Sequence, residues 1–158
     1  MRPPQFIDSH CHLDYPAFTR DLSDVLSRAH NAGVSQLIIA GVAPAGWARQ
    51  KALAQRYAGI HYTIGIHPWS LNQLQLSLAQ CLAIMTQYLE QSCPPLALGE
   101  VGLDRSKRCP TPLETQISWM TGQIDWAQAH GLPLVLHVVR AHGKAREILK
   151  SLDHSAGG

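Results

Sequence analysis

The chain has 158 residues, of which 46% are hydrophobic and 15% are charged, and its formal net charge at neutral pH is +2. This composition is typical of one globular domain, and it excludes a disordered or fibrous chain and any strong basic field for nucleic acid. There is no apolar run of about 18 residues and no signal-peptide pattern, so we expect no membrane partner and no secretion. The four cysteines form no CxxC pair, which favours free thiols and a cytoplasmic protein.

Short apolar runs rich in β-branched residues alternate with amphipathic stretches along nearly the whole sequence. This alternation predicts βα units built around a parallel sheet. We expect five strands, at Gln5–Asp8, Val34–Ala40, His61–Ile66, Leu96–Val101 and Pro133–Val139.

The stretches between these runs carry apolar residues at helical spacing. They predict a helix from Leu22 to Gly33, a weaker one between Pro44 and Tyr57, and a longer apolar stripe from Leu74 to Leu89. A final helix is expected between His142 and Leu152.

The helix before the fifth strand has the strongest start signal. Thr111 and Glu114 have the spacing of a capping box, and Pro112 between them suits the first helical position. Gly131 followed by Pro133 predicts where this helix ends.

The spacing of the strands indicates the architecture. The 128 residues from Phe6 to Leu134 hold four units of 32 residues each, which is close to the repeat of a (β/α)8 barrel of about 250 residues. We therefore predict an α/β fold on the TIM-barrel plan, with residues 1–158 as an incomplete domain of about five βα units, lacking the sixth to eighth. The chain stops where a sixth strand is expected, at residues 154–158. A small doubly wound open sheet is the alternative.

His10 and His12 follow the first predicted strand. Residues two apart in an extended segment project to the same side, so both imidazoles can bind one metal ion. The alternative is two histidines that are exposed or hydrogen-bonded at the start of a loop.

Glu100 and His137 lie near the ends of the fourth and fifth predicted strands, within apolar runs. A buried carboxylate must be paired or coordinated, and a buried histidine needs partners for its ring nitrogens. Gly99 and Gly102 leave room beside Glu100 for a ligand or a sharp bend. An ordinary turn and a hydrogen-bonded core histidine are the alternatives.

The carboxyl ends of parallel strands meet on the face where such folds build their sites, so these four side chains are expected to converge. His67 follows the third strand on the same rim, where it could contact a substrate. Arg105 and Arg140, after the fourth and fifth strands, could hold phosphates, or they could belong to a solvated surface. The aromatic residues nearby, which could stack on unpaired bases, are Tyr15, Phe18 and Trp69.

Four stretches together resemble the TatD-type metal-dependent deoxyribonucleases, which belong to the wider group of amidohydrolase-like barrels. They lie in the family's order at residues 6–14, 65–68, 99–104 and 132–137. The resemblance covers the N-terminal part of the family pattern.

This resemblance implies a site with two divalent metal ions, of which Zn, Mn and Mg are all candidates. His10 and His12 would bind one ion, Glu100 would bridge both and act in catalysis, and His137 would bind the second. The activity implied is hydrolysis of phosphodiester bonds in DNA by metal-activated water, and we expect a single-stranded substrate.

The family pattern also includes a metal-binding histidine after the sixth strand and an essential aspartate after the eighth, which lie outside the 158 residues. Asp153 and His154 precede the expected sixth strand and are not assigned these roles. We therefore expect impaired activity. The alternative is a non-catalytic remnant, or an assembly fragment, that binds metal weakly. Exposed edges of the first and fifth strands would favour self-association.

Overall fold

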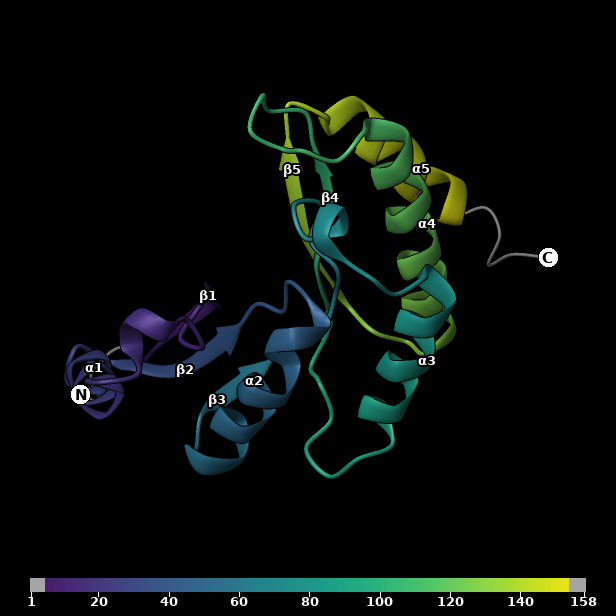
Figure 1. Cartoon of the computed structure of the whole chain (residues 1–158). Helices are drawn as coiled ribbons and strands as arrows, with labels where there is room; N and C mark the ends of the chain where they lie inside the picture. The colour runs from purple at the N-terminus through teal and green to yellow at the C-terminus, as the bar shows by residue number, and fades with distance from the viewer. Residues whose placement is uncertain (1–4, 154–158) are drawn as a thin grey trace.

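The structure is a computed structural model that describes residues 5–153; the expected turn toward a sixth strand, and His154, lie outside these residues. Strands and helices alternate along the chain (Figure 1). Among the described residues, no helix has both the length and the apolar character needed to cross a bilayer. The order of elements is β1 (Phe6–Cys11), α1 (Leu22–Asn31), β2 (Val34–Ile39), α2 (Pro44–Arg56), β3 (Ile60–Tyr62), α3 (Leu78–Leu89), β4 (Leu98–Asp104), α4 (Leu113–Ala129), β5 (Leu134–Val139) and α5 (His142–Asp153), with short 3-10 turns at Pro16–Phe18 and Leu71–Gln73.

All strand pairs are parallel and follow chain order. β1, β2 and β3 form one ladder, and β4 and β5 form another. A parallel bridge between Ile64 and Leu98 connects the two ladders, and the Gly99 N–H donates to the Ile64 carbonyl at 2.9 Å. Sequential parallel strands with intervening helices form part of a (β/α)8 barrel, whereas a doubly wound sheet would reverse its strand order. The predicted fold class is therefore confirmed.

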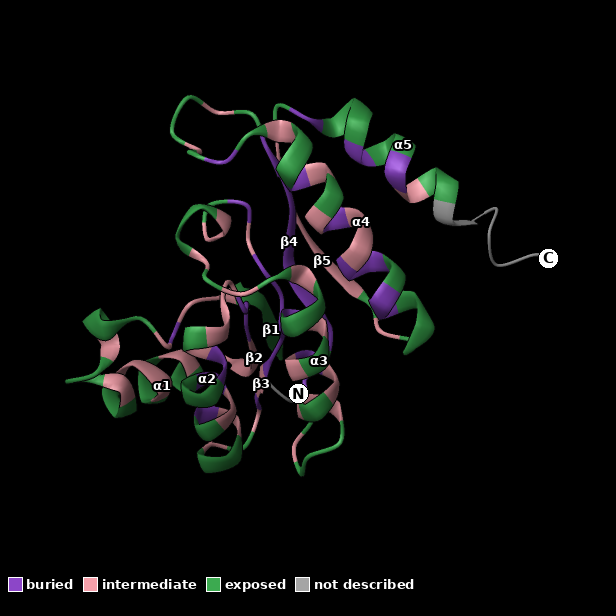
Figure 2. Ribbon diagram, turned by 45° about the vertical axis from the view of Figure 1, so that its right-hand side comes forward, coloured by how far each residue is buried: buried purple, intermediate pink, exposed green. Residues whose placement is uncertain are grey.

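Burial is uneven across the sheet. Every residue of β4 is buried, while β1 is largely exposed, with Phe6 54% and Ile7 63% accessible (Figure 2). The helices α1, α2, α4 and α5 pack against β2, β3, β4 and β5 respectively. Among residues 5–153, β1 pairs only with β2 and β5 only with β4, so each leaves one edge open.

The structure moves several strand ends relative to the predicted ones. β3 spans Ile60–Tyr62 rather than His61–Ile66, because the chain after Tyr62 pairs through an isolated bridge from Ile64 to Leu98 instead of a continuous ladder. β1 continues to Cys11, so His10 lies within the strand rather than after it. β4 runs to Asp104 rather than ending at Val101, because its last three residues pair with His137–Val139 of β5. β1 and β4 therefore reach further toward the rim where the polar side chains gather.

Two helix starts also differ from the expected ones. The apolar stripe from Leu74 is interrupted, and α3 begins only after Ser77, whose side chain forms a capping box with Gln80. The capping box expected at Thr111 is absent: its hydroxyl donates to the Pro68 carbonyl at 2.8 Å, and Pro112 precedes the first helical residue. A hydroxyl that is engaged across the fold is not available to cap its own helix.

Two buried glutamines of α4 attach this helix to the chain at the rim. The Gln116 side chain accepts from the Asp104 N–H at 2.7 Å and donates to the Asp104 carbonyl at 3.0 Å. Gln123 makes the same pair of contacts with Ile66, at 2.7 and 3.3 Å. Side-chain amides thus replace missing backbone partners just before His67 and at the end of β4.

The two glycines of β4 allow the backbone of β5 to approach closely. Gly102 has a φ of +155°, and a Cβ there would lie 1.9 Å from the His137 carbonyl oxygen. Gly99 has the same kind of contact with Val135, where a Cβ would lie 2.5 Å from the carbonyl oxygen. The room beside Glu100 is therefore filled by β5 rather than by a ligand.

We predict that Gly102→Ala lowers the free energy of unfolding by about 2 kcal/mol or more, because a side chain there meets a backbone carbonyl at an unfavourable φ. Urea unfolding would measure the loss. The matched control is Gly143→Ala in α5, where a Cβ meets nothing within 4 Å. The control should leave stability unchanged or raise it by up to about 1 kcal/mol. Equal stability of the two variants would contradict the proposed contact.

Candidate metal centre

Glu100 lies at the centre of a cluster of histidines. Its side chain is only 10% exposed, and its two carboxylate oxygens face different rings. Oε2 lies 3.3 Å from His10 Nε2 and 3.8 Å from His12 Nε2. Oε1 lies 2.9 Å from His137 Nδ1 and 3.9 Å from His67 Nε2. The structure thus brings together all four predicted metal-binding side chains, with His67 beside them.

The cluster draws on three strands and one loop: β1 and the residue after it, β4, β5, and the loop after β3. His10 and His12 leave β1 on the same side, with ring centroids 5.2 Å apart and ring planes at 81°. The Glu100 N–H donates to the Gly41 carbonyl, which ties β4 to the end of β2. The His67 N–H donates to the Val42 carbonyl at 2.9 Å, which holds the loop after β3.

Asp104 is a member of this site that the strand prediction missed. Its carboxylate accepts from His137 Nε2 at 3.0 Å, from Trp69 Nε1 at 2.7 Å and from the Ser106 N–H at 2.7 Å. Burial alone would raise the pKa of Asp104, but these donors hold it well below its usual range. Asp104 follows Glu100 by four residues, so a longer β4 in the prediction would have found it.

The proton positions of His137 follow from its two carboxylate neighbours. The hydrogen bond with Glu100 raises the pKa of His137, and Asp104 adds to this effect against the cost of burial. Burial would raise the pKa of Glu100, but His137, His67 and His10 together lower it. The ring of His137 thus lies between two carboxylates that favour its protonated form. A neutral ring that binds a metal through Nδ1 would donate from Nε2 to Asp104.

A backbone hydrogen bond fixes the tautomer of His67. The Trp69 N–H donates to His67 Nδ1 at 3.0 Å, so a neutral ring carries its proton on Nε2. Burial, followed by the charge of His137, lowers the pKa of His67 to about 4. At neutral pH His67 therefore presents an N–H to the cluster, as a hydrogen-bond donor rather than a metal ligand.

The donor atoms fit divalent metal binding. One group contains His10, His12 and Glu100, and a second contains His67, Glu100 and His137, with the ligand atoms of each group within 4.8 Å of one another. Imidazole nitrogens with a carboxylate suit zinc and manganese, and carboxylates also suit magnesium. The tautomer of His67 leaves Glu100 and His137 as the ligands of the second group.

A cavity of about 550 Å³ opens beside the cluster. It is lined by His12, His67 and Glu100 of the cluster and by three aromatic residues. The aromatic residues are Tyr15, Phe18 and Trp69. The lining also includes Asp14, whose Oδ2 accepts from Gln50, while its Oδ1 is buried with no hydrogen-bond partner in the described part. The sequence patterns assign no role to Asp14.

The two predicted phosphate-binding arginines lie at the same rim but outside the cluster. Asp104 of β4 and Val139 of β5 are paired in the register, and the two arginines, Arg105 and Arg140, are the next residues of their strands. The Arg105 N–H donates to the Val139 carbonyl at 2.9 Å. Both residues are exposed. Within residues 5–153, neither guanidinium makes a hydrogen bond or ion pair. They are adjacent cations that remain free to contact a ligand.

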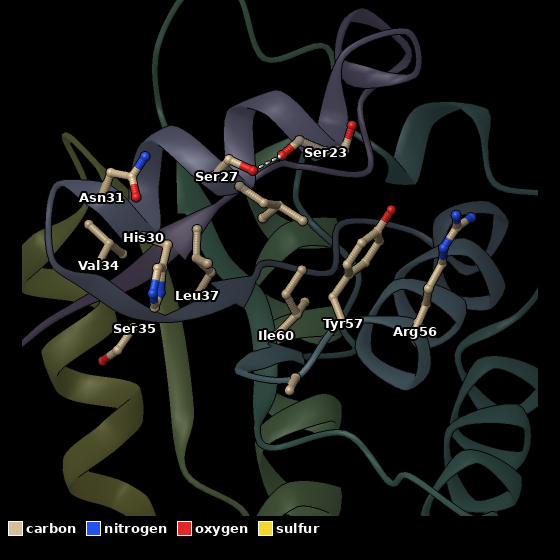
Figure 3. A pocket seen from close by; sticks show the side chains of 12 residues that line it. Ser23, Ser27, His30, Asn31, Val34, Ser35, Leu37, Arg56, Tyr57 and Ile60 are labelled. Atoms are coloured by element: carbon tan, nitrogen blue, oxygen red, sulfur yellow. Dashed lines mark hydrogen bonds between the residues drawn. The ribbon is translucent and has the colours of Figure 1, made fainter.

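A second hollow, of about 490 Å³, lies at the other end of the sheet (Figure 3). Its lining runs from His30 at the end of α1 to Val34 and Ile60 at the amino ends of β2 and β3, with Arg56 and Tyr57 on its far side. No carboxylate lines it. It therefore does not compete with the cluster as a metal site.

We predict that His67 makes the metal-free protein less stable as the pH falls from about 6.5 to about 4. In this range the unfolded chain binds a proton on His67 that the folded chain does not, so stability decreases with acidification. The raised pKa of His137 has the opposite effect near a pH of 6.5, and this effect disappears at lower pH, where the ring is protonated in both states.

The test is urea unfolding with a chelator present at several pH values, for the native sequence and for His67→Asn. The variant should lose less stability over this range. An unchanged pH slope in the variant would contradict the burial of a neutral ring. His30→Asn is the control, because His30 is exposed.

Comparisons with known proteins identify the family of this chain. The sequence profile of the family described as "TatD related DNase" matches residues 7–158. The metal-dependent hydrolase YjjV of Escherichia coli K12, itself described as uncharacterized, is 36% identical over 94% of this chain and 56% of its own length. Human deoxyribonuclease TATDN3 is 33% identical over 83% of this chain and 51% of its own. A 3'-5' ssDNA/RNA exonuclease TatD of Enterobacter lignolyticus is 31% identical over 90% and 53%.

Solved structures show the same fold. The crystal structure of the TatD homologue YjjV from Escherichia coli aligns with a TM-score of 0.84 and 35% identity, over 92% of this chain and 55% of that chain. A TatD family hydrolase from Entamoeba histolytica aligns with a TM-score of 0.81 at 24% identity, over 96% and 55%. This chain spans about half the length of the curated relatives it matches. By its sequence profile and its relatives, the chain belongs to the TatD-related deoxyribonuclease family of metal-dependent hydrolases.

Proposed function

We propose that this chain carries the metal-binding part of a hydrolase that cleaves phosphodiester bonds in single-stranded DNA. The observation that carries the proposal is the division of Glu100 between two groups of nitrogens. Its Oε2 faces His10 and His12, and its Oε1 faces His137. A carboxylate in this position is suited to bridge two cations.

The cofactors in this proposal are two divalent ions, zinc, manganese or magnesium. His10 and His12 would hold the first through Nε2, His137 would hold the second through Nδ1, and Glu100 would hold both. Such ions lower the pKa of a bound water and stabilise charge on the phosphodiester oxygens. The pairing of a metal-binding histidine with a carboxylate, here His137 with Asp104, is typical of sites where the outer partner orients the ring.

Other residues would bind the substrate. His67 presents its Nε2–H toward the carboxylate, so it can donate to a phosphate oxygen while staying neutral above a pH of about 4. Arg105 and Arg140 can pair with neighbouring phosphates, because both are exposed at the rim and unpaired within residues 5–153. Such contacts position a strand without reading its sequence.

The substrate class is supported by the relatives. Among the curated relatives, one is named as a 3'-5' exonuclease on single-stranded DNA and RNA and another as a deoxyribonuclease. We propose DNA with unpaired bases, and the free thiols of all four cysteines support a reducing, cytoplasmic setting.

The relatives are about twice as long, and we propose that residues 1–158 correspond to the first five units of their barrel. The family resemblance assigns one further metal ligand and an essential aspartate to later units, so activity of this chain is expected to be reduced. The open edges of β1 and β5 are positions where a second copy, or a chain supplying the remaining strands, could pair.

We predict manganese-dependent release of nucleotides from single-stranded DNA by the purified chain, lost with a chelator and lowered at least about 100-fold by Glu100→Ala, because that change removes the shared ligand. Loss of activity in Glu100→Ala would exclude a contaminating nuclease. The matched control is Glu147→Ala, an exposed glutamate paired with Lys144, which should leave activity unchanged. No activity, together with metal binding that needs His10 and His12, would favour the non-catalytic alternative.

We also predict that Asp104→Ala weakens metal binding about 10- to 100-fold, because His137 loses the carboxylate that holds its ring. Isothermal titration with zinc would measure the change. Asp104→Asn keeps the volume of the side chain and tests the charge alone. Asp125→Ala, at an exposed position of α4, should bind zinc like the native sequence. Unchanged affinity in both Asp104 variants would contradict the orienting role.

A further inference from the structure

We propose that the cavity beside the metal centre binds one unpaired nucleobase, with the indole of Trp69 as its stacking surface. This inference rests on the proposed function and adds to it a base-binding subsite. The cavity holds about 550 Å³, within the range of sites for small ligands. It adjoins His12, His67 and Glu100, so a group bound there lies next to the proposed reaction centre.

Trp69 is fixed in place although much of it is accessible. Its Nε1–H donates to Asp104 at 2.7 Å and its backbone N–H donates to His67 Nδ1 at 3.0 Å. Yet Trp69 is 42% exposed and lines the cavity. A ring held by its polar edge loses little freedom when a ligand stacks on it, which favours binding.

The composition of the cavity favours a base over a phosphate. Among its lining residues, Tyr15, Phe18 and Val42 complete an aromatic and apolar wall, and there is no lysine or arginine. The exposed arginines lie instead at the ends of β4 and β5. An uncharged planar group therefore suits the cavity, while the phosphate suits the metal centre.

The position of Trp69 next to His67 suits the order of parts in a nucleotide. The two ring centroids are 6.3 Å apart, with an interplanar angle of 73°. In a bound nucleotide, the sugar separates the phosphate from the base. The phosphate could then accept a hydrogen bond from His67 while the base of the same nucleotide stacks on Trp69. A base in this cavity must be unstacked and unpaired, which selects single strands. Stacking is tolerant of sequence because every base has a π-face.

The experiment compares two single-stranded probes, an oligothymidylate and an abasic oligonucleotide of equal length, by fluorescence anisotropy at low salt with a chelator. The native chain should bind the oligothymidylate more tightly than the abasic strand. Trp69→Ala should weaken oligothymidylate binding by about 5- to 150-fold and leave abasic binding unchanged.

A second variant separates stacking from the hydrogen bond to Asp104. Trp69→Phe keeps an aromatic ring and loses the N–H, so it should retain most of the preference for the strand with bases. Trp119→Phe, on α4 and outside the cavity lining, is the matched control and should bind both probes like the native chain.

The inference is overturned if Trp69→Ala keeps the preference for bases, or if both Trp69 variants weaken the two probes equally. Its failure differs from failure of the proposed function. A chain that hydrolyses single-stranded DNA but binds both probes equally refutes only the base subsite. A chain that binds neither probe and hydrolyses nothing refutes both.

Discussion

The buried carboxylate of Glu100 is the interaction on which the site depends. Removing a carboxylate from water costs several kcal/mol unless other groups compensate for its charge. Here imidazoles from β1, β5 and the loop after β3 surround it. The polar residues at the strand ends are therefore not separate features. Each histidine reduces the cost of burying the same charge, and the carboxylate in turn holds each ring near its neighbours.

The strands reach this arrangement through close backbone contact. Gly99 and Gly102 lie on either side of Glu100 along β4, and both allow the backbone of β5 to approach closely. This approach places His137 opposite Gly102 in the register, so its ring can reach Glu100 on one side and Asp104 on the other. The glycines thus act on the site through the spacing of the two strands.

The sequence patterns predicted the strands and the convergence of four side chains, because alternation of apolar runs reports burial and parallel strands share a rim. They missed Asp104, because an apolar run does not show where the pairing of β4 with β5 ends. The capping box at Thr111 was predicted wrongly, because local spacing does not show that the Pro68 carbonyl competes for the hydroxyl. The tautomer of His67 depends on a backbone N–H two residues later, which no pattern of residue types reports.

The two glutamines of α4 attach this outer helix to the site at two points. Gln116 and Gln123 are seven residues apart, so they lie on the same side of the helix, two turns apart. One holds Asp104 and the other holds the residue before His67. Because an amide does not titrate, this attachment persists through the pH range in which the histidines gain or lose protons. The helix therefore holds both points in a fixed relation. A substitution that displaces it would shift Asp104, the partner of His137, together with the loop of His67. The effects of substitutions at Gln116 and Gln123 should therefore not be additive.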